Sequence, residues 1–447
     1  MKTIKNTFRN LLRYPSAVFG LAVITFLLFV AAYALITIPY SEAIRLWRGG
    51  EEVWYQNPQY AAPSWFNWFT QKKQPVSFSV NTADGSMPRT VTTKSQDVST
   101  VDITYSFDYE YDGFPQEMTL YFKPIIKEKL PFASISWITP DGRTIRIADT
   151  MVQYNQAFRI SQDLKLQTRL KTEKVMEALF SDPNTATPTV LKGTYQLVVS
   201  GTTFEKDNDY QVQFVLYGNL YGNAGTDKYR RDLFLPLLYG TPIALAFGLL
   251  AALGTSFLTM IISAIGTWYG GWLDELIQRI TEVNMVLPFL AILIMVGTFY
   301  SRSIWLMLGV TILLSIFSGS IKTYRSIFMQ SKESGYIEAA RAYGASSTRI
   351  IFSYMIPRMI PLLIPTLVSS VPGFVFLEAS LAVLGLGDPV LPTWGKMIND
   401  AFGDGALYQG RYYWVLEPAI LLMITGFGFA MLGFALDRIF NPRLRDV

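Results

Sequence analysis

The most informative stretch of this chain reads Glu338-Ala339-Ala340-Arg341-Ala342-Tyr343-Gly344 and continues through Ile350-Ile351 to Ile356-Pro357. Its small alanines let another surface approach one helical face closely, and Glu338 offers a negative charge beside them. Gly344 permits a positive φ and therefore predicts the end of that helix. Because the stretch lies in a basic segment between two long apolar runs, we predict a short helix on the cytoplasmic side of a membrane bundle, shaped to dock on a partner protein.

The composition is that of a membrane protein. Half of the 447 residues are hydrophobic and 16% are charged, whereas soluble domains carry about 25% charged residues. Six segments are apolar and long enough to cross a hydrocarbon core, which takes about 20 residues. They are roughly residues 16–38, 237–267, 279–299, 303–322, 360–384 and 413–436. We expect the long, glycine-containing second segment to tilt, to break or to begin with an interfacial turn.

The positive charges orient these segments. Four basic residues precede the first segment, and the first acidic residue of the chain is Glu42. The positive-inside rule therefore puts the N-terminus in the cytoplasm. Counting spans puts the loop 323–359 on the same side, and this loop carries five basic residues against two acidic ones. The basic C-terminal tail also falls inside, which predicts a multi-pass protein of the inner (cytoplasmic) membrane with both termini cytoplasmic.

The first apolar segment could instead be a signal peptide. An uncleaved anchor is favoured, because the apolar run is longer than the h-region of a signal peptide and no small-residue cleavage site is evident.

Several function classes are excluded by residues that the chain lacks. It has no cysteine and no histidine, which removes disulfide frameworks, Cys/His zinc sites and histidine-based catalysis. It has no G-x-x-x-x-G-K-[ST] loop to hold a nucleotide phosphate. The net charge of +4 is modest and its basic residues cluster at membrane edges, so we expect no nucleic-acid binding. We predict a non-catalytic chain that binds no metal and no cofactor.

Residues 41–232 have a different pattern. Apolar and polar residues alternate without a break over 101–111, as in a half-buried strand. Further strands are predicted at 132–138, 144–147, 193–201 and 209–216. Pro140-Asp141-Gly142 makes the first two of these a hairpin, and we expect the last two to pair as well. Between the pairs, 161–181 resembles one amphipathic helix. The pattern predicts an inserted extracytoplasmic α+β domain resembling a β-sandwich.

The role of this insert stays open between two interpretations. A folded domain that stabilises the assembly is favoured over a surface that contacts a receptor or cargo. The segment 54–78 is rich in aromatic residues, namely Trp54, Tyr55, Tyr60, Trp65, Phe66, Trp68 and Phe69. Such residues stack on sugars, cover peptide side chains or lie at the membrane interface. The interface is favoured here, because the segment follows closely after the first span.

Further motifs accompany the stretch at Glu338. In chain order they are Gly225-Thr226-Asp227, Arg230-Arg231-Asp232, Gly270-Gly271-Trp272-Leu273-Asp274 with Arg279, Leu377-Glu378-Ala379-Ser380-Leu381, Leu384-Gly385-Leu386-Gly387, Pro392-Thr393-Trp394-Gly395 and Asn441-Pro442-Arg443-Leu444-Arg445. Together they resemble the permease subunits of ABC importers in the oligopeptide/dipeptide class, over residues 1–40 and 225–447. The chain departs from that pattern at Arg230, Pro236 and Asn441, and in the large insert.

The resemblance implies a fold and a set of partners. It implies a first part, 1–40, with the cytoplasmic N-terminus and first transmembrane helix; the insert; and a five-helix core, 233–447, with the coupling loop 323–359. The partners would be a second, related permease subunit forming a heterodimer, one or two ATPase subunits that hold ATP and Mg, and an extracytoplasmic solute-binding protein.

The implied function is a translocation path for oligopeptides and dipeptides, driven by ATP hydrolysis in the partner subunits. Relatives in this class also carry oligosaccharides or nickel, and these stay as alternatives, although the lack of histidine and cysteine gives no support for a path for a soft metal. Outside the transporters, a membrane-anchored sensor or assembly scaffold is the alternative. Six spans and a coupling loop are more than an anchor needs.

The resemblance also carries candidate site residues. Those implied to couple to the ATPase are Tyr336, Glu338, Ala339, Ala340 and Gly344. Those of the translocation path or gate are Glu378, Gly385, Gly387 and Trp394. The glycines lie where the fifth span ends and predict irregular backbone, which membranes tolerate only where protein or a water-filled cavity covers it.

Three charged residues have structural interpretations as well. Glu378 lies inside an apolar run, where a carboxylate is costly and marks a functional site by default. A buried structural partner is nevertheless favoured for it. For Asp274 and Arg279, a structural cytoplasmic turn is favoured over contact with substrate.

Overall fold

The computed structural model describes residues 11–440, apart from positions 96, 155, 186 and 207. The predictions for the cytoplasmic N-terminal residues and for the tail around Asn441 lie outside the described residues. The chain divides into two compact units. One unit is helical and comprises the described residues up to Arg48 together with those from Leu235 onward. The other is rich in β-strands and comprises Gly49–Phe234.

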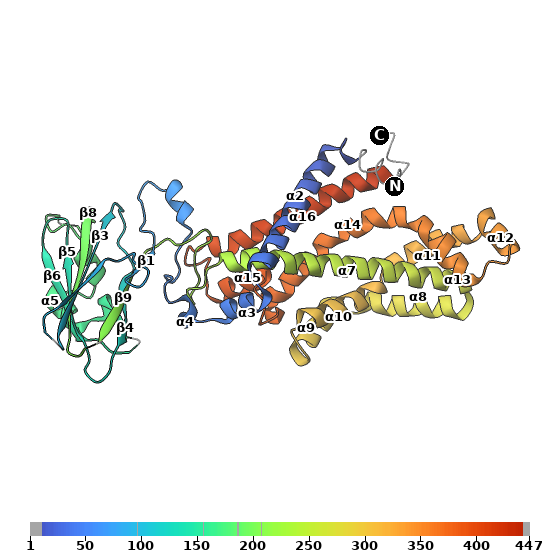
Figure 1. Ribbon diagram of the computed structural model, residues 1–447. Coiled ribbons are helices and arrows are strands. Elements are labelled where there is room, and N and C mark those ends of the chain that lie inside the picture. The colour runs from blue at the N-terminus through green and yellow to red at the C-terminus, as the bar shows by residue number, and fades with distance from the viewer. Residues whose placement is uncertain (1–10, 96, 155, 186, 207, 441–447) are drawn as a thin grey trace. The chain divides into compact units, whose positions relative to one another are not determined.

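The helical unit is built of helices, and the β-rich unit is inserted in the chain between α3 and α7 (Figure 1). Its elements are α2 (Pro15–Thr37), α3 (Tyr40–Arg48), α7 (Phe234–Tyr269), α8 (Gly271–Val286), α9 (Phe289–Phe299), α10 (Ile304–Ile316), α11 (Gly319–Lys332), α12 (Gly335–Ala342), α13 (Ser347–Arg349), α14 (Ile356–Leu381), α15 (Trp394–Gly403) and α16 (Tyr413–Phe440). Helix α3, which the sequence analysis assigned to the insert, belongs to this unit.

Four helical stretches among the described residues are long and apolar enough to cross a membrane. They are Pro15–Thr37, Phe234–Tyr269, Ser347–Leu386 and Tyr413–Phe440. The number rises to six if each of two bent pairs counts as one span. The chain is therefore predominantly helical, with four to six candidate spans.

The two bent pairs correspond to the third and fourth predicted segments. Helices α8 and α9 meet at 80°, and α10 and α11 meet at 49°. Pro288 follows the end of α8 and explains the first bend, because proline lacks a backbone N–H and disfavours helical backbone in the residue before it. The second predicted segment shows no break, since α7 runs continuously for 36 residues.

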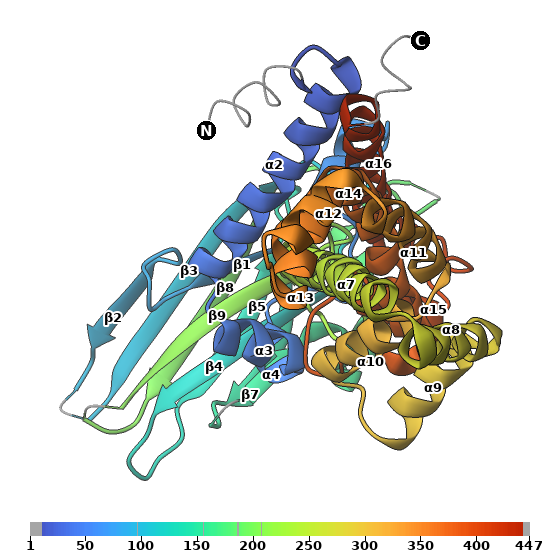
Figure 2. The same ribbon diagram turned by 90° about the vertical axis from the view of Figure 1, so that its right-hand side faces the viewer.

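Small residues allow α2 and α16 to pack closely. Figures 1 and 2 both show α2 beside α16. A Cβ atom added at Gly20 would lie 2.6 Å from the carbonyl oxygen of Gly428, so the two backbones approach more closely than any side chain allows. Such glycine contacts are typical of helix pairs in membranes, where close van der Waals packing drives association.

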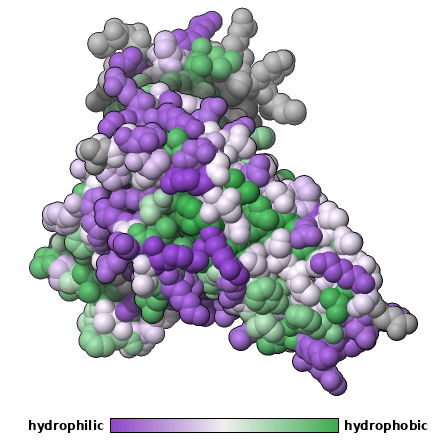
Figure 3. All heavy atoms as spheres, turned by 90° about the vertical axis from the view of Figure 1, so that its left-hand side faces the viewer, coloured by the Kyte–Doolittle hydropathy of each residue, from purple (hydrophilic) through white to green (hydrophobic). Residues whose placement is uncertain are grey.

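The second unit is a sandwich of two antiparallel sheets. One sheet has the order β1-β9-β4-β7 and the other the order β2-β3-β8-β5-β6. The strands are β1 (Phe78–Asn81), β2 (Arg89–Thr93), β3 (Ser99–Tyr109), β4 (Glu117–Ile125), β5 (Phe132–Ile138), β6 (Thr144–Met151), β7 (Gln156–Arg159), β8 (Gly193–Thr203) and β9 (Asp209–Tyr217). Buried residues of both sheets form one hydrophobic cluster. Hydrophilic residues cover much of the face drawn in Figure 3, as expected where alternate strand residues point to water.

The structure confirms some predictions for the insert and corrects others. The hairpin around Gly142 is confirmed, since β5 pairs with β6 and Gly142 has a φ of 84°. The predicted pairing of 193–201 with 209–216 is wrong, because β8 and β9 lie in different sheets. Each strand pairs over its full length with another strand: β8 pairs with all of β3, and β9 pairs with all of β4.

The single helix predicted at 161–181 is also wrong. The segment forms two short helices, α5 (Leu164–Leu170) and α6 (Val175–Phe180). Lys171 adopts a left-handed conformation with a φ of 54° and ends α5. Both helices still contribute residues to the sandwich core, among them Leu166 and Leu179. The apolar spacing was therefore correct, but it does not reveal the turn between the helices.

We expect a fragment of residues 49–234 to fold alone and to lose stability in acid. Hydrogen bonds from the backbone N–H groups of Glu128 and Lys129 lower the pKa of Glu205. A hydrogen bond with Lys192 lowers that of Asp112. A lowered folded-state pKa gives stability that is present above the unfolded pKa, about 4 for carboxylates, and is lost as the pH falls through the folded value.

Circular dichroism melting of this fragment at pH 7 and pH 3 tests the prediction. Burial raises the pKa of Asp227 and of Asp232, so these two groups favour the folded state more as the pH falls. Both are present in the parent fragment and in a Glu205 variant, so comparing the two fragments isolates the effect of Glu205. Glu205→Gln should show a smaller loss of melting temperature in acid than the parent fragment. An equal loss in both, or a fragment without cooperative β-rich melting, contradicts the assignment.

Candidate functional site

Helix α12 has one anchored face and one open face. Ile337 and Ala340 are buried in a cluster shared with α7, α11 and α14. Glu338 and Ala339 are exposed on the opposite side, and the Tyr343 side chain that follows the helix is 91% exposed. Figure 1 shows α12 at one end of the helical unit, near α11 and α13. The helix thus offers a small acidic and aromatic surface on a fixed base.

The predicted end of this helix is confirmed. Helix α12 stops at Ala342, and Gly344 has a φ of 77°. A Cβ added at Gly344 would meet no atom within 4 Å, so only its backbone conformation demands glycine. Of the predicted coupling residues, the structure brings Glu338, Ala339 and Gly344 to the open side. It buries Ala340, and it turns Tyr336 toward the base, where the hydroxyl groups of Tyr336 and Ser331 lie 2.6 Å apart.

Two cation–π contacts tie this region to the long helices. The Arg341 guanidinium lies 4.4 Å from the ring centre of Trp268, near the end of α7. The Arg358 guanidinium lies 4.3 Å from the ring centre of Tyr336. Lys332 donates to the carbonyl oxygens of Thr267 and Trp268, both at 3.0 Å, and so caps the C-terminus of α7. The Arg341 contact thus joins α12 directly to α7, and the Lys332 contacts join α11 to it.

Asp274 and Arg279, which follow the two glycines after α7, have different partners in the structure. Arg325 of α11 donates to both carboxylate oxygens of Asp274, at 2.8 and 2.9 Å. Arg279 instead pairs with Glu282 on its own helix at 3.0 Å and is exposed. Asp274 thus joins α8 to α11, a structural contact, and Arg279 takes no part in it.

A groove of about 470 Å³ lies where both bent helix pairs break. Its lining combines residues of α7, of both breaks and of α14. The polar lining residues are Thr255, Ser256, Thr259, Asn284, Ser315, Ser318, Ser320, Tyr324, Thr366 and Ser370. The lining contains no charged residue. Irregular backbone in a membrane is tolerated where it is covered by protein or lines a water-filled cavity, so this groove is the candidate translocation path.

Asn284 holds the broken backbone together at this groove. Its side-chain amide donates to the carbonyl oxygens of Leu314 and Phe317, both at 2.7 Å. Those carbonyls lie at the end of α10, where helical partners are missing. Sequence reasoning missed the groove. The signal present in the sequence was the set of Ser, Thr and Asn residues inside apolar runs, together with Pro288.

The four residues predicted for the path or gate lie outside this groove lining. Glu378 and Gly387 line a second cavity of only about 10 Å³ with Arg302 and Asp388, a space of about one water molecule. Glu378 is buried, and its side chain is hydrogen-bonded with that of Thr393. The irregular backbone predicted here is confirmed, since Gly385 has a φ of 82° within a π-helical turn over Ala382–Leu386.

Trp394 is a packing residue in this structure. It is fully buried, and its ring nitrogen Nε1 donates to the carbonyl oxygen of Leu237 at 2.9 Å. A Cβ added at Gly240 would lie 2.5 Å from the Trp394 ring. The next residue, Gly395, packs equally tightly on the backbone of Ala379. The Pro-Thr-Trp-Gly motif therefore fixes α15 against α7 and α14.

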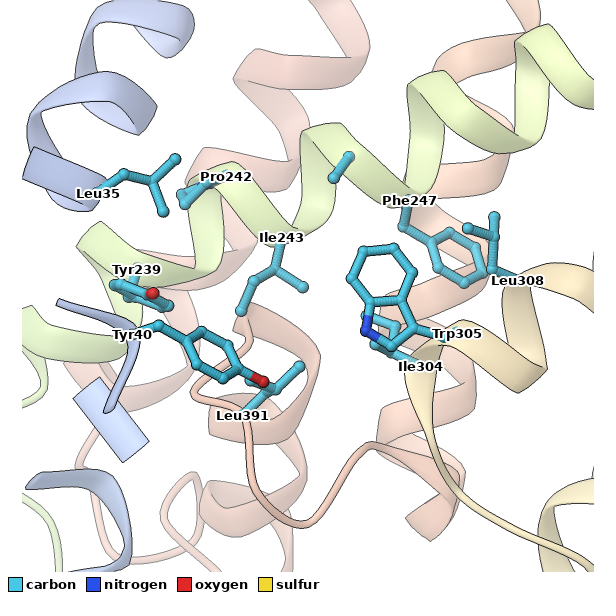
Figure 4. Close-up of a pocket in the computed structure, with 11 residues that line it drawn as sticks. Leu35, Tyr40, Tyr239, Pro242, Ile243, Phe247, Ile304, Trp305, Leu308 and Leu391 are labelled. Atoms are coloured by element: carbon cyan, nitrogen blue, oxygen red, sulfur yellow. The ribbon is translucent and has the colours of Figure 1, made fainter. Parts of the chain in front are cut away.

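Another cavity in the helical unit is apolar. It measures about 220 Å³, and Figure 4 shows the side chains around it. The lining residues are Leu35, Tyr40, Tyr239, Pro242, Ile243, Ala246, Phe247, Ile304, Trp305, Leu308 and Leu391. Ligand sites place a few polar groups to orient the ligand, and this lining offers few of them. The polar groove, which joins both helix breaks, is therefore the candidate that we develop below.

Sequence comparison finds related transport proteins. Residues 256–446 match the family described as binding-protein-dependent transport system inner membrane component. The dipeptide transport system permease protein DppC of Bacillus subtilis is 30% identical over 222 residues, 49% of this chain and 68% of that protein. The oligopeptide permease protein OppC of the same species is 28% identical over 222 residues, 49% of this chain and 72% of that protein.

A third relative is also a transport permease. The glutathione transport system permease protein GsiD of Pectobacterium atrosepticum is 29% identical over 225 residues, 50% of this chain and 73% of that protein. The matched family region contains α8–α16, and with them α12 and both helix breaks. The chain belongs to the permeases of peptide ABC importers, the inner membrane components of binding-protein-dependent transport systems.

Proposed function

We propose that this chain forms part of the path by which an ATP-driven importer moves short peptides into the cell. The observation that carries the proposal is the neutral polar groove at the two helix breaks. Its hydroxyl and amide groups can hydrogen-bond peptide backbone, and its apolar residues can accommodate varied side chains. Since no charged residue lines it, passage does not depend on the charge of the peptide side chains.

We propose the partners and the coupling by analogy with the family. We propose that α12 docks on an ATPase subunit through Glu338, Ala339 and the exposed Tyr343, with Tyr336 and Gly344 fixing its shape. ATP binding in that subunit would move α12, and the Arg341–Trp268 contact would carry the movement to α7. The helical unit would then alternate between outward and inward states that the nucleotide biases. A related second permease and a solute-binding protein complete the assembly.

We further propose that the β-rich unit, residues 49–234, is extracytoplasmic and that both termini are cytoplasmic, since the charges flanking the apolar segments favour this orientation. Oligosaccharides stay the second candidate cargo, because neutral hydroxyl-rich linings hydrogen-bond sugars as well as peptides. Nickel has less support: the described residues contain no group of three His, Cys, Asp or Glu that could hold a metal ion.

Uptake competition tests the cargo class. The chain is reconstituted in proteoliposomes with its partner subunits and binding protein, and ATP-driven uptake of a labelled oligopeptide is measured. Unlabelled dipeptides and oligopeptides should compete and oligosaccharides should not. Uptake that oligosaccharides suppress and peptides leave unchanged would reverse the assignment.

The contact between Arg341 and Trp268 gives a prediction about coupling. Trp268→Ala removes a cation–π contact of about 0.5–2 kcal/mol from the link between α12 and α7. We expect more ATP to be hydrolysed per peptide transported, with the ATPase still bound. Trp268→Phe, which keeps a ring, should restore part of the ratio. Trp272→Ala is the matched control, because that side chain is 74% exposed. An unchanged ratio in Trp268→Ala would show that the contact transmits nothing.

A further inference from the structure

The aromatic residues between positions 54 and 78 do not form one surface. Tyr55 packs edge-on against Tyr121, with ring centres 4.8 Å apart, and donates to the side-chain oxygen of Gln213. Trp65 donates from Nε1 to the carbonyl oxygen of Asn223 at 2.9 Å. By contrast, Trp68 and Phe69 are 82% and 78% exposed. Trp68 and Phe69 are thus the most exposed aromatic side chains of the loop 64–73, and Phe69 also packs edge-on against Trp65, with ring centres 6.1 Å apart.

This loop is braced at its base. Asn67 and Gln74 exchange two hydrogen bonds of 2.9 Å. The backbone N–H of Lys73 donates to the Asp112 carboxylate at 2.8 Å, and the Asp112 N–H donates back to the Lys73 carbonyl at the same distance. A braced loop therefore holds two large aromatic side chains in solvent. Leaving each side chain exposed forgoes about 1.5–3 kcal/mol of burial free energy, which a surface covering the tip would recover.

Charge and chain continuity identify that surface. Lys72 and Lys73 follow the aromatic tip directly, and Lys72 is exposed. Aromatic residues beside lysines are the combination that concentrates at bilayer interfaces, with rings at headgroup depth and cations near lipid phosphates. The loop is also joined closely to membrane-spanning chain. Its Trp65 is hydrogen-bonded to the carbonyl oxygen of Asn223. Asn223 lies only eleven residues before Phe234, the first residue of the candidate span α7.

We propose that the loop 64–73 inserts Trp68 and Phe69 into the outer surface of the bilayer that holds the helical unit, with Lys72 at anionic lipid phosphates. The insertion depth is that of an interfacial anchor, roughly 5–10 Å. The loop would fix the β-rich unit to the membrane surface. This inference requires the chain to span a membrane with its β-rich unit outside. It does not depend on the cargo or on the ATPase contact proposed above.

Spin labelling tests the proposal cleanly, because the chain has no native cysteine. Phe69→Cys is labelled in the assembled transporter, held in nanodiscs of phosphatidylethanolamine and phosphatidylglycerol. Collisions of the label with oxygen, which concentrates in lipid, are compared with collisions with a water-soluble nickel chelate. Leu164→Cys is the matched control, since Leu164 is an equally exposed apolar residue, at 75%, elsewhere in the same unit.

The label at position 69 should favour oxygen, and the label at position 164 should favour the nickel chelate. Equal nickel accessibility at both positions would overturn the proposal. Protection of position 69 that appears only when the solute-binding protein is added would also overturn it, in favour of a protein partner. Lys72→Glu in the Phe69→Cys background should shift the label toward the nickel chelate, and an unchanged ratio would contradict the role given to Lys72.

Discussion

Replacing Gly344 by valine abolishes ATP-driven peptide uptake while the protein stays in the membrane. Gly344 has a φ of 77°, and a β-branched residue is strained there even though space around it is open. Left-handed backbone costs an ordinary residue about 1–2 kcal/mol, and a β-branched one more. The helix end would shift to avoid this strain. Because α12 meets the ATPase in our account, uptake and copurification of the ATPase should be lost together.

The loop provides matched controls for this result. Gly335 begins α12, has no positive φ and also has open space around its Cβ position, so Gly335→Val should transport nearly normally. Glu338→Ala should lose uptake like Gly344→Val, because it removes the charge that we assign to the ATPase contact. Glu333→Ala changes an exposed glutamate outside the helix and should not. Normal uptake in Gly344→Val and Glu338→Ala would refute the coupling assignment.

The second large effect is expected at Asn284. Asn284→Leu keeps a similar volume but leaves the carbonyls of Leu314 and Phe317 without their donor. Each lost hydrogen bond costs about 0.5–1.5 kcal/mol, and Asn284 makes two. We expect a lower melting temperature of the purified protein and a strong loss of uptake, since the break between α10 and α11 shapes the groove.

A variant at Thr255 tests whether the groove has a role in transport or only a structural role. Thr255 lines the groove, and its hydroxyl oxygen is buried without a hydrogen-bond partner among the described residues. Thr255→Val should therefore not lower the melting temperature and should still lower uptake, because a residue of the groove lining loses its polar group. If Thr255→Val transports like the parent protein and Asn284→Leu is only less stable, the groove is a structural feature and not the path.

Local features were predictable from the sequence. The helix end at Gly344, the turn at Gly142 and the irregular backbone at Gly385 each depend on neighbouring residues only. Glycine backbone freedom and turn chemistry suffice to identify them. The same holds for the apolar segments, whose length and composition predict spans. The family motifs likewise identified the α12 region without any knowledge of the fold.

Features that join distant parts of the chain were not predictable in this way. The partners of β8 and β9 depend on long-range competition between strands, which alternation alone does not describe. The groove combines residues from α7 to α14, and the Trp268–Arg341 contact joins residues that are far apart in sequence. Trp394 and Glu378 were recognised as motif residues. Only the structure shows that Trp394 fills a packed site and that Glu378 lines a cavity of about 10 Å³.

The most direct test of the central claim is cross-linking of cargo during transport. Ser256 lines the polar groove, and Trp305 lines the apolar cavity. The chain has no native cysteine, so a cysteine introduced at either position is unique. A peptide carrying a thiol-reactive group is supplied with the binding protein and ATP to the reconstituted transporter. Our account predicts ATP-dependent cross-linking at position 256 and little at position 305. Cross-linking at position 305 without any at position 256 would contradict it.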